Sequence, residues 1–398
     1  MTTALKRGRS TPGATGWQRP AGDGAGEYPL PTPPVSVGVI ESIATGVPAA
    51  SFDQLEAAER VAALFDDTEQ RERIVRVYQN TMVKTRHFAI DPLGAEFLAF
   101  SQSVGTIRER MALYFQHAVP LAVDVARRAM EGCRSAADEF GLLVFVTSTG
   151  FIAPGVDAAL INQLGFPLTI SRMTINFMGC AAAMNGLHAA VDFARAHPDK
   201  KALVVCLELS SINAVFADNA NDLIIHSLFG DGCGAMVVGA ASPGTPAPPG
   251  AIIVRDGFSQ LFPGTEDGIV LGVNHNGITC ELAESLPKYI YRGVDAALAQ
   301  VLADNKLTKS TVDLWAIHPG GPKIVDEASR SLNLPPDASR WSWDVLAEFG
   351  NMLSVSLIFV LQRIARQTGA TKDIETGVAF SFAPGVALEG IVFDVVRR

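Results

Sequence analysis

Short apolar runs alternate with helical segments from residue 141 to the end of the chain, and this alternation limits the fold more than any other feature. The first run is Leu142–Val146, and a second series of the same kind begins at Val312. Continuous apolar runs of this length are typical of strands that are buried on both faces, with helices covering the sheet. We therefore predict an α/β fold that contains two similar halves.

The chain is expected to have three parts. Residues 1–34 are predicted to be a flexible tail, because six prolines and five glycines lie between Thr11 and Pro34. Residues 35–250 are predicted to form an N-terminal half, which carries the cysteine described below. Residues 251–398 are predicted to form a C-terminal half of similar construction.

Composition and charge argue against several classes of protein. The formal net charge is −9, which disfavours nucleic acid as the main partner. The five cysteines are scattered with no CxxC pair, so neither a disulfide framework nor a metal site is expected. No apolar run approaches the length of a membrane span, and no secretory signal is recognisable. We therefore expect a cytoplasmic protein with free thiols.

A cysteine at a strand-to-helix turn is the first candidate for catalysis. An apolar run from Pro167 to Phe177 is followed by Gly179, and a helical pattern of small residues begins at Cys180. The start of a helix favours an anion, so we expect the pKa of this thiol to be lowered and its thiolate to act as a nucleophile. The other four cysteines are expected to be packing residues.

Two further polar residues occupy comparable turns. His318 follows an apolar run and precedes the segment Pro-Gly-Gly-Pro, and Asn351 lies between a glycine and a helix. An imidazolium can hold a thiolate, and an amide can bind a developing oxyanion. The residues alone therefore predict a Cys-His-Asn enzyme that acts on an acyl group. They do not distinguish a papain-like hydrolase from a thioester-condensing enzyme.

Two other features have simple interpretations. Arg73, Arg76 and Asn80 fall near one face of a helical region that begins at Phe52, and a solvated helix face explains them without a ligand. The three glycines within 230–234 precede a strand and not a helix. We therefore interpret them as a turn that enters a core strand, and not as a phosphate-binding loop.

Four motifs occur in a characteristic order. They are Met178-Gly-Cys-Ala-Ala, Leu228-Phe-Gly-Asp-Gly232, Ala316-Ile-His-Pro-Gly-Gly and Gly350-Asn-Met-Leu-Ser354, and Ser381-Phe-Ala-Pro-Gly385 follows them. With them, residues 35–398 resemble the type III polyketide synthases, the chalcone-synthase-like branch of the thiolase superfamily. The last segment is similar to the C-terminal glycine-rich loop of that family.

The resemblance implies a thiolase fold in five αβαβα layers, a homodimer, and no cofactor beyond coenzyme A thioester substrates. It implies that Cys180 takes a starter acyl group from an acyl-CoA, while His318 and Asn351 stabilise the enolate formed by decarboxylation of malonyl-CoA. Phe229 is similar to the family's gating aromatic residue. By the same resemblance, the residues that contact the coenzyme A phosphates are Arg73, Arg76 and Asn80, although Asn80 stands where relatives have a basic residue.

The cavity positions differ from those of plant chalcone synthases. Cys280 stands in place of a second gating phenylalanine, Leu271 in place of a small residue, and Ala153 in place of a methionine that reaches across the dimer. Thr149 and Ser210 are small residues at positions that line the cavity in relatives. This pattern resembles bacterial members that accept long-chain fatty acyl starters and release alkylpyrones.

We therefore predict a long-chain acyl-CoA starter, one or more extensions with malonyl-CoA, and lactonisation to an alkyl-α-pyrone. A resorcinol product or an aromatic starter is the alternative within the family. A β-ketoacyl synthase III type enzyme, which performs a single condensation, is the nearest alternative outside it. A Cys-His-Asn hydrolase is an alternative of a different class.

Overall fold

The computed structural model describes residues 36–103, 105–214, 220–242, 244–274, 277–368 and 370–397. Its strands are β1 Val37–Gly46, β2 Ala50–Asp53, β3 Thr85–Phe88, β4 Phe140–Thr147, β5 Ser171–Asn176, β6 Lys201–Leu209, β7 Asp231–Ala241, β8 Ile252–Leu261, β9 Ile269–Asn274, β10 Gly277–Leu282, β11 Leu314–Ile317, β12 Ile374–Ala383 and β13 Ala387–Val396. Its helices are α1 Gln54–Ala62, α2 Thr68–Gln79, α3 Ala95–Ser103, α4 Ile107–Gly132, α5 Val156–Leu164, α6 Ala182–Ala196, α7 Ala220–Leu228, α8 Leu286–Asp304, α9 Pro322–Leu332, α10 Arg340–Phe349 and α11 Ser356–Arg366.

One mixed sheet connects the two halves of the chain. Its strands are hydrogen-bonded in the order β11-β12-β13-β8-β1-β7-β6-β4-β5. The two halves meet where β1 pairs with β8, over the short register from Gly38–Val254 to Ile40–Ile252. The N-terminal half contains a parallel group, since β4 pairs in parallel with both β5 and β6. The C-terminal half contains the parallel pair β11–β12.

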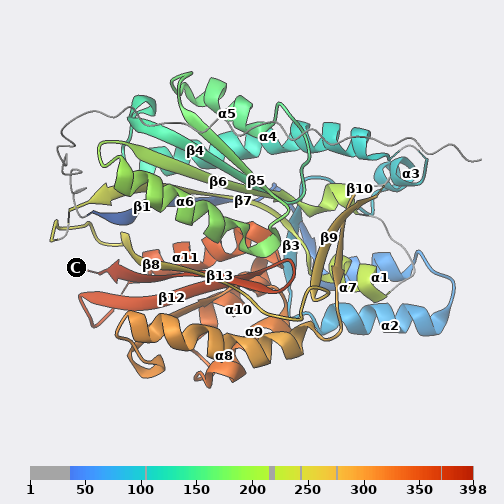
Figure 1. Ribbon diagram of the computed structural model, residues 1–398. Coiled ribbons are helices and arrows are strands. Elements are labelled where there is room, and N and C mark those ends of the chain that lie inside the picture. Colours follow the sequence, from blue (N-terminus) through green and yellow to red (C-terminus); the bar gives the residue numbers. More distant parts are fainter. Residues whose placement is uncertain are drawn as a thin grey trace, which may run out of the picture. The chain divides into compact units, whose positions relative to one another are not determined.

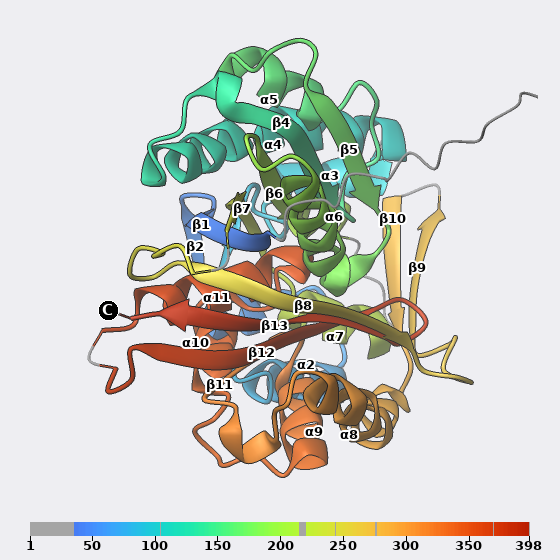
Figure 2. The same ribbon diagram turned by 60° about the vertical axis from the view of Figure 1, so that its left-hand side comes forward.

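Helices and strands alternate in layers (Figure 1). Helices α4 and α5 cover the strands of the N-terminal half, α6 and α11 lie between the two groups of strands, and α8 and α9 cover the strands of the C-terminal half. Three large apolar clusters fill the spaces between these layers. The turned view in Figure 2 shows α6 and α11 again between the two groups of strands. The five αβαβα layers predicted from the resemblance are therefore confirmed.

Small residues allow the inner helix α6 to lie close to the sheet. A Cβ atom at Gly186 would stand 3.1 Å from a methyl group of Val146 and 3.3 Å from one of Val204. The alanines Ala182 and Ala183 of the first turn are also buried. Short side chains reduce the distance between helix and strands, so the N-terminus of α6 reaches the interior between the two halves.

The helical region that begins at Phe52 differs from its prediction. The sequence indicated one helix as far as Tyr78, but the structure has α1 and α2. Each has its own N-cap, because Asp53 accepts a hydrogen bond from Leu55 N–H and Asp67 accepts one from Gln70 N–H. The predicted tail, residues 1–34, lies outside the described residues. In the part of the chain that is described, no helix is both long and apolar enough to cross a membrane.

Candidate active site

The turn at Cys180 joins β5 to α6 through two residues in the left-handed region. Phe177 has a φ of +58° and Gly179 a φ of +56°, and a 3₁₀ turn, η2 Gly179–Ala181, leads into α6. The N–H of Gly179 donates to Ser148 Oγ at 3.0 Å, which ties the turn to the loop after β4. The predicted sharp strand-to-helix turn is confirmed.

The surroundings of the Cys180 thiol are apolar. Its side chain packs against a cluster that includes Leu228, Phe229 and Leu353. Burial raises the pKa of Cys180 above that of an ordinary thiol, and Cys280 acts in the same direction. Our expectation that the start of the helix lowers this pKa is therefore wrong for an isolated thiolate. A helix N-terminus stabilises an anion by about 0.3–2 kcal/mol. Burial of the thiolate away from water destabilises it by more than this amount.

Asn351 reaches the sulfur from the C-terminal half. Its Oδ1 and its Nδ2 each lie 4.0 Å from Cys180 Sγ. The Oδ1 accepts a hydrogen bond from Leu353 N–H at 2.9 Å, and the Nδ2 donates to the carbonyl of Gly320 at 3.2 Å. These two bonds fix the orientation of the amide. The second hydrogen of Nδ2 is left for the sulfur or for a ligand beside it.

His318 follows β11 and is 1% exposed. Its backbone N–H donates to the carbonyl of Phe380 at 3.0 Å. Its ring packs closely on Gly320, since a Cβ atom added to Gly320 would lie 3.1 Å from Cδ2 of the ring. Burial lowers the pKa of His318 to about 3, and Asn351 opposes this shift. Neither ring nitrogen has a hydrogen-bond partner among the described residues. The ring is therefore a neutral imidazole with one donor and one acceptor unused.

The two shifts in pKa have a common physical origin, and they limit how a thiolate can form. Burial disfavours a lone thiolate at Cys180 and a lone imidazolium at His318. When a proton moves from the thiol to the imidazole, both charges form together, and their attraction in a low dielectric opposes both penalties. An imidazolium–thiolate pair at these two residues would therefore have to form jointly, and the pair stays a prediction.

Glu208 was missed by reasoning from the sequence. It lies in β6, is 0% exposed, and accepts hydrogen bonds from Ser148 N–H at 2.9 Å, Thr149 Oγ1 at 2.8 Å and Ser354 Oγ at 2.6 Å. Burial raises its pKa to about 7, although these donors oppose the shift. Glu208 thereby connects the loop that holds the Cys180 turn to the turn after Asn351. A carboxylate within an apolar strand was the available signal.

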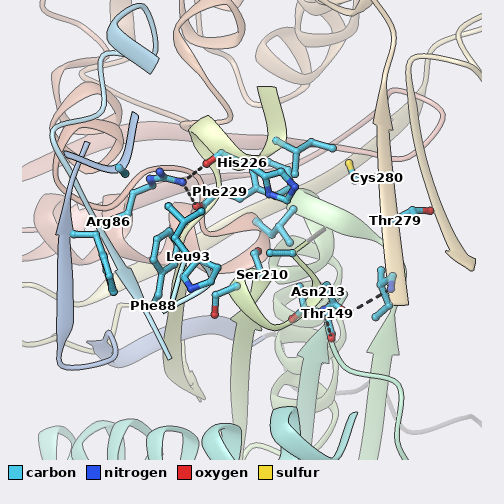
Figure 3. Close-up of a pocket in the computed structure, with 18 of the residues that line it drawn as sticks. Arg86, Phe88, Leu93, Thr149, Ser210, Asn213, His226, Phe229, Thr279 and Cys280 are labelled. Atoms are coloured by element: carbon cyan, nitrogen blue, oxygen red, sulfur yellow. Dashed lines mark hydrogen bonds between the residues drawn. The ribbon is translucent and has the colours of Figure 1, made fainter. Parts of the chain in front are cut away.

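A cavity adjoins this group (Figure 3). Its lining includes all five residues that were predicted to border it, namely Thr149, Ser210, Phe229, Leu271 and Cys280. Four members of the cluster around the Cys180 thiol belong to this lining: Ile225, Phe229, Cys280 and Leu353. Cys180, His318 and Asn351 are not themselves lining residues, so these four side chains connect the surroundings of the thiol to the cavity. Their roles in gating and in selecting a starter stay predictions.

The cavity extends further than the sequence indicated. Beyond Phe229 it continues between α7 and the N-terminal β2–β3 segment, where Phe52, Phe88, Leu93 and Ile225 supply an apolar lining. Figure 3 shows Phe88 and Leu93 beside Arg86 at this end, with Thr279 and Cys280 at the other. The cavity is thus lined mostly by apolar side chains, and its volume is about 90 Å³.

The residues predicted to bind coenzyme A lie apart from this cavity. Arg73 and Arg76 are exposed on the outer face of α2, and Asn80 is exposed at its C-terminal end. Arg76 forms an ion pair with Glu72 at 3.4 Å. None of the three basic or polar side chains is among the residues that line the cavity. Their contact with coenzyme A phosphates stays a prediction.

Ala153 does not line the main cavity either. It lies in a separate groove, where it neighbours Phe151, which is 60% exposed. No group of three or more His, Cys, Asp or Glu side chains is arranged to hold a metal ion within the described ranges.

Comparison with known families and proteins adds independent evidence. The family model "Chalcone and stilbene synthases, N-terminal domain" matches residues 36–243, and the model of the C-terminal domain matches residues 254–397. The chain is 57% identical over 368 residues to the alpha-pyrone synthesis polyketide synthase-like protein Pks18 of Mycobacterium tuberculosis, a match that covers 92% of this chain and 94% of that protein.

Two further relatives extend the comparison. The 1,3,6,8-tetrahydroxynaphthalene synthase of Streptomyces coelicolor is 31% identical over 313 residues, which covers 78% of this chain and 79% of that protein. The crystal structure of PKS-I from the brown alga Ectocarpus siliculosus superposes with a TM-score of 0.83 at 38% identity, covering 91% of this chain and 99% of that structure. This likeness confirms the thiolase fold. Together these matches favour the polyketide branch over both the β-ketoacyl synthase III type and the hydrolase. The chain therefore belongs to the chalcone and stilbene synthase family, and it is a type III polyketide synthase, a decarboxylative condensing enzyme.

Proposed function

We propose that Cys180, His318 and Asn351 are the catalytic residues of this condensing enzyme. The observation that carries the proposal is the contact of 4.0 Å between Cys180 Sγ and the amide of Asn351, beside the buried His318. In the first step, the thiol proton moves to His318 and the sulfur attacks the thioester carbonyl of an acyl-CoA. The departing coenzyme A thiolate takes the proton back from the imidazolium, and the acyl group stays on the sulfur.

In the second step, malonyl-CoA loses carbon dioxide and leaves the enolate of acetyl-CoA. The apolar wall formed by Phe229 and Leu353 disfavours the malonyl carboxylate, and the free N–H groups of His318 and Asn351 can donate to the enolate oxygen. The enolate carbon then attacks the thioester on Cys180. The products are a β-ketoacyl-CoA and the Cys180 thiolate, which takes up one proton from solvent to restore the thiol for the next cycle. This chemistry requires no bound cofactor.

The starter is proposed to be a long-chain fatty acyl-CoA, and the product an alkyl-α-pyrone. The apolar lining of the cavity supports such a starter, and Cys280 lies in this lining, where a phenylalanine would narrow the space. The relative from Mycobacterium tuberculosis is named for alpha-pyrone synthesis, which supports the same type of product. Arg73, Arg76 and Asn80 are proposed to bind the phosphates of coenzyme A, since an arginine donates two parallel hydrogen bonds to a phosphate.

A homodimer and a cytoplasmic location are also proposed. Strand β5 lies at one end of the nine-stranded order, and its neighbourhood exposes Phe151, Ile152, Leu168 and Met173. An exposed edge strand with apolar residues around it is suited to pairing with a second copy. A cytoplasmic location is consistent with a nucleophilic thiol, which must stay reduced to act.

Product analysis with labelled malonyl-CoA tests the proposal. We expect pyrones from acyl-CoA starters of long chain length, and weak turnover with aromatic starters. Turnover that is restricted to aromatic starters would contradict the fatty acyl assignment. Failure to release carbon dioxide from malonyl-CoA would contradict the proposed roles of the catalytic residues. Sedimentation analysis of the same sample tests the dimer.

A further inference from the structure

Arg86 is a buried cation at one end of the cavity. It lies in β3 and is 2% exposed, and no ion pair joins it to a carboxylate among the described residues. Burial lowers the pKa of Arg86, while Tyr78 and Asp231 oppose the shift. A buried charge costs several kcal/mol unless hydrogen bonds replace the lost water, so such a residue needs an explanation.

The partners of Arg86 are carbonyl groups at the C-terminal end of α7. Its Nη1 donates to the carbonyl of His226 at 2.5 Å and to that of Phe229 at 2.9 Å (Figure 3). Its Nε donates to Oε1 of Gln54 at 3.0 Å, and the Nε2 of Gln54 donates to the carbonyl of Ser227 at 2.7 Å. The last carbonyls of a helix lack partners within it and carry partial negative charge, so they stabilise a cation.

The carbonyl of Leu228 lies at the same helix end, but neither Arg86 nor Gln54 binds it. It accepts a hydrogen bond from the backbone of Asn351 instead. The N–H of Asn351 donates to Leu228 at 2.8 Å, and Gly230 N–H donates back to the carbonyl of Asn351 at 3.0 Å. These two bonds place Phe229 opposite Asn351 in an isolated parallel bridge. The proposed gate residue and the proposed catalytic amide are thus joined through their backbones.

The stem of Arg86 contacts the other strand of this bridge. A Cβ atom at Gly350 would lie 3.0 Å from both Cγ and Cδ of Arg86, and 2.5 Å from the carbonyl oxygen of Leu228. Gly350 also has a φ of +68°, which favours glycine. Arg86 therefore binds the Phe229 segment by its guanidinium and packs on the Asn351 segment by its methylene groups.

We propose that Arg86, oriented by Gln54, is a positioning residue that sets Phe229 and Asn351 relative to each other. The inference rests on the function proposed above, because it acts through the amide of Asn351. A displacement of about 1 Å in a catalytic group can cost about 100-fold in rate. Without the guanidinium of Arg86, the end of α7 loses the hydrogen bonds to the carbonyls of His226 and Phe229. The backbone bridge between Phe229 and Asn351 then shifts as well.

The test is the variant Arg86→Lys, which keeps the charge but cannot reach three acceptors with one ammonium group. Malonyl-CoA decarboxylation and starter condensation are measured separately, per folded enzyme. We expect kcat to fall about 100-fold in both reactions, while KM for malonyl-CoA changes by less than about threefold. Gln54→Met removes the group that orients Arg86, and we expect the same pattern with a loss of about tenfold. If Arg86→Lys does not fold, the kcat and KM of Gln54→Met test the inference.

Arg397→Lys is the matched control. The Arg397 side chain is 4% exposed and donates to the carbonyl of Ile364 at 2.7 Å, but it contacts neither Phe229 nor Asn351. The substitution Arg397→Lys should lower the melting temperature of the protein and leave kcat per folded enzyme unchanged. An equal loss of kcat in Arg397→Lys, or normal kcat in both Arg86→Lys and Gln54→Met, would overturn the inference. A wild-type enzyme that does not decarboxylate malonyl-CoA would instead refute the proposed function.

Discussion

The sulfur of Cys180 and the amide of Asn351 lie 4.0 Å apart, although 171 positions of sequence separate them. Each residue occupies an equivalent place in its half of the chain. The 3₁₀ turn that contains Cys180 leads into α6, and a 3₁₀ turn after Asn351, η5 Leu353–Val355, leads into α11. Both α6 and α11 lie between the two groups of strands, and the two turns that lead into them are in contact. Each half of the chain therefore supplies one residue of the candidate site, Cys180 from the first and Asn351 from the second.

Replacement of the nucleophile should abolish condensation without unfolding the protein. In Cys180→Ala we expect turnover to fall by more than about 1000-fold, since loss of a nucleophile removes the covalent step. Mass spectrometry of the enzyme with acyl-CoA should show no acyl adduct. Cys133→Ala, at the end of α4 away from the cavity, is the control and should keep the adduct. An adduct that persists in Cys180→Ala would place the loading site elsewhere.

Reactivity of Cys180 should depend on His318. Burial raises the pKa of the thiol and lowers that of the imidazole to about 3, so we expect the thiolate to form together with an imidazolium, by transfer of the proton to this ring. In His318→Gln we expect alkylation of Cys180 by iodoacetamide at pH 7 to slow by about 100-fold and to recover only at alkaline pH. His188→Gln is the control, because the His188 Nε2 is bound to the Gly390 carbonyl at 2.8 Å. Equal rates in both variants would contradict the joint formation of the charges.

The length of the starter that the enzyme accepts should depend on the size of the side chain at position 280. Cys280 lines the cavity together with Leu271, its partner in the β9–β10 register. In Cys280→Phe the ring should fill this space, so the longest accepted starter should shorten by several carbons while short starters retain their turnover. Chromatography of the pyrones from a series of starters measures the change. Cys280→Ser, of nearly equal volume, should keep the wild-type profile. An unchanged profile in Cys280→Phe would mean that the chain does not pass this residue.

The stability of the protein should depend on the ionisation of Glu208. Burial raises the pKa of this carboxyl from 4.5 to about 7, so the folded state holds the proton more tightly than the unfolded state. The stability that it contributes is therefore fully present below pH 4.5 and is lost as the pH rises to about 7. The loss amounts to about 3 kcal/mol. The free energy of unfolding, measured with urea between pH 5 and pH 8, should depend less on pH in Glu208→Gln than in the wild type. A surface variant, Glu72→Gln, should keep the wild-type slope.

The sequence predicted local structure well where one physical signal dominated. The turn between the apolar run and the helix at Cys180 was predicted correctly, since Gly179, which is in the left-handed region, ends the run. The region from Phe52 was predicted as one helix because the apolar spacing runs through the break. Asp67 was the missed signal, since an N-cap side chain begins a new helix even where the apolar pattern continues.

Within the candidate site, the sequence determined which residue types stand at the turns. Cys180, His318 and Asn351 were identified because glycines and prolines beside them specify a local backbone. Only the tertiary structure showed that burial raises the pKa of the thiol, that Glu208 connects two turns, and that Arg86 binds the end of α7. These features depend on solvation and on contacts between segments far apart in the chain. Local patterns carry no record of distant neighbours, because desolvation and hydrogen-bond partners are set only when the two halves pack together.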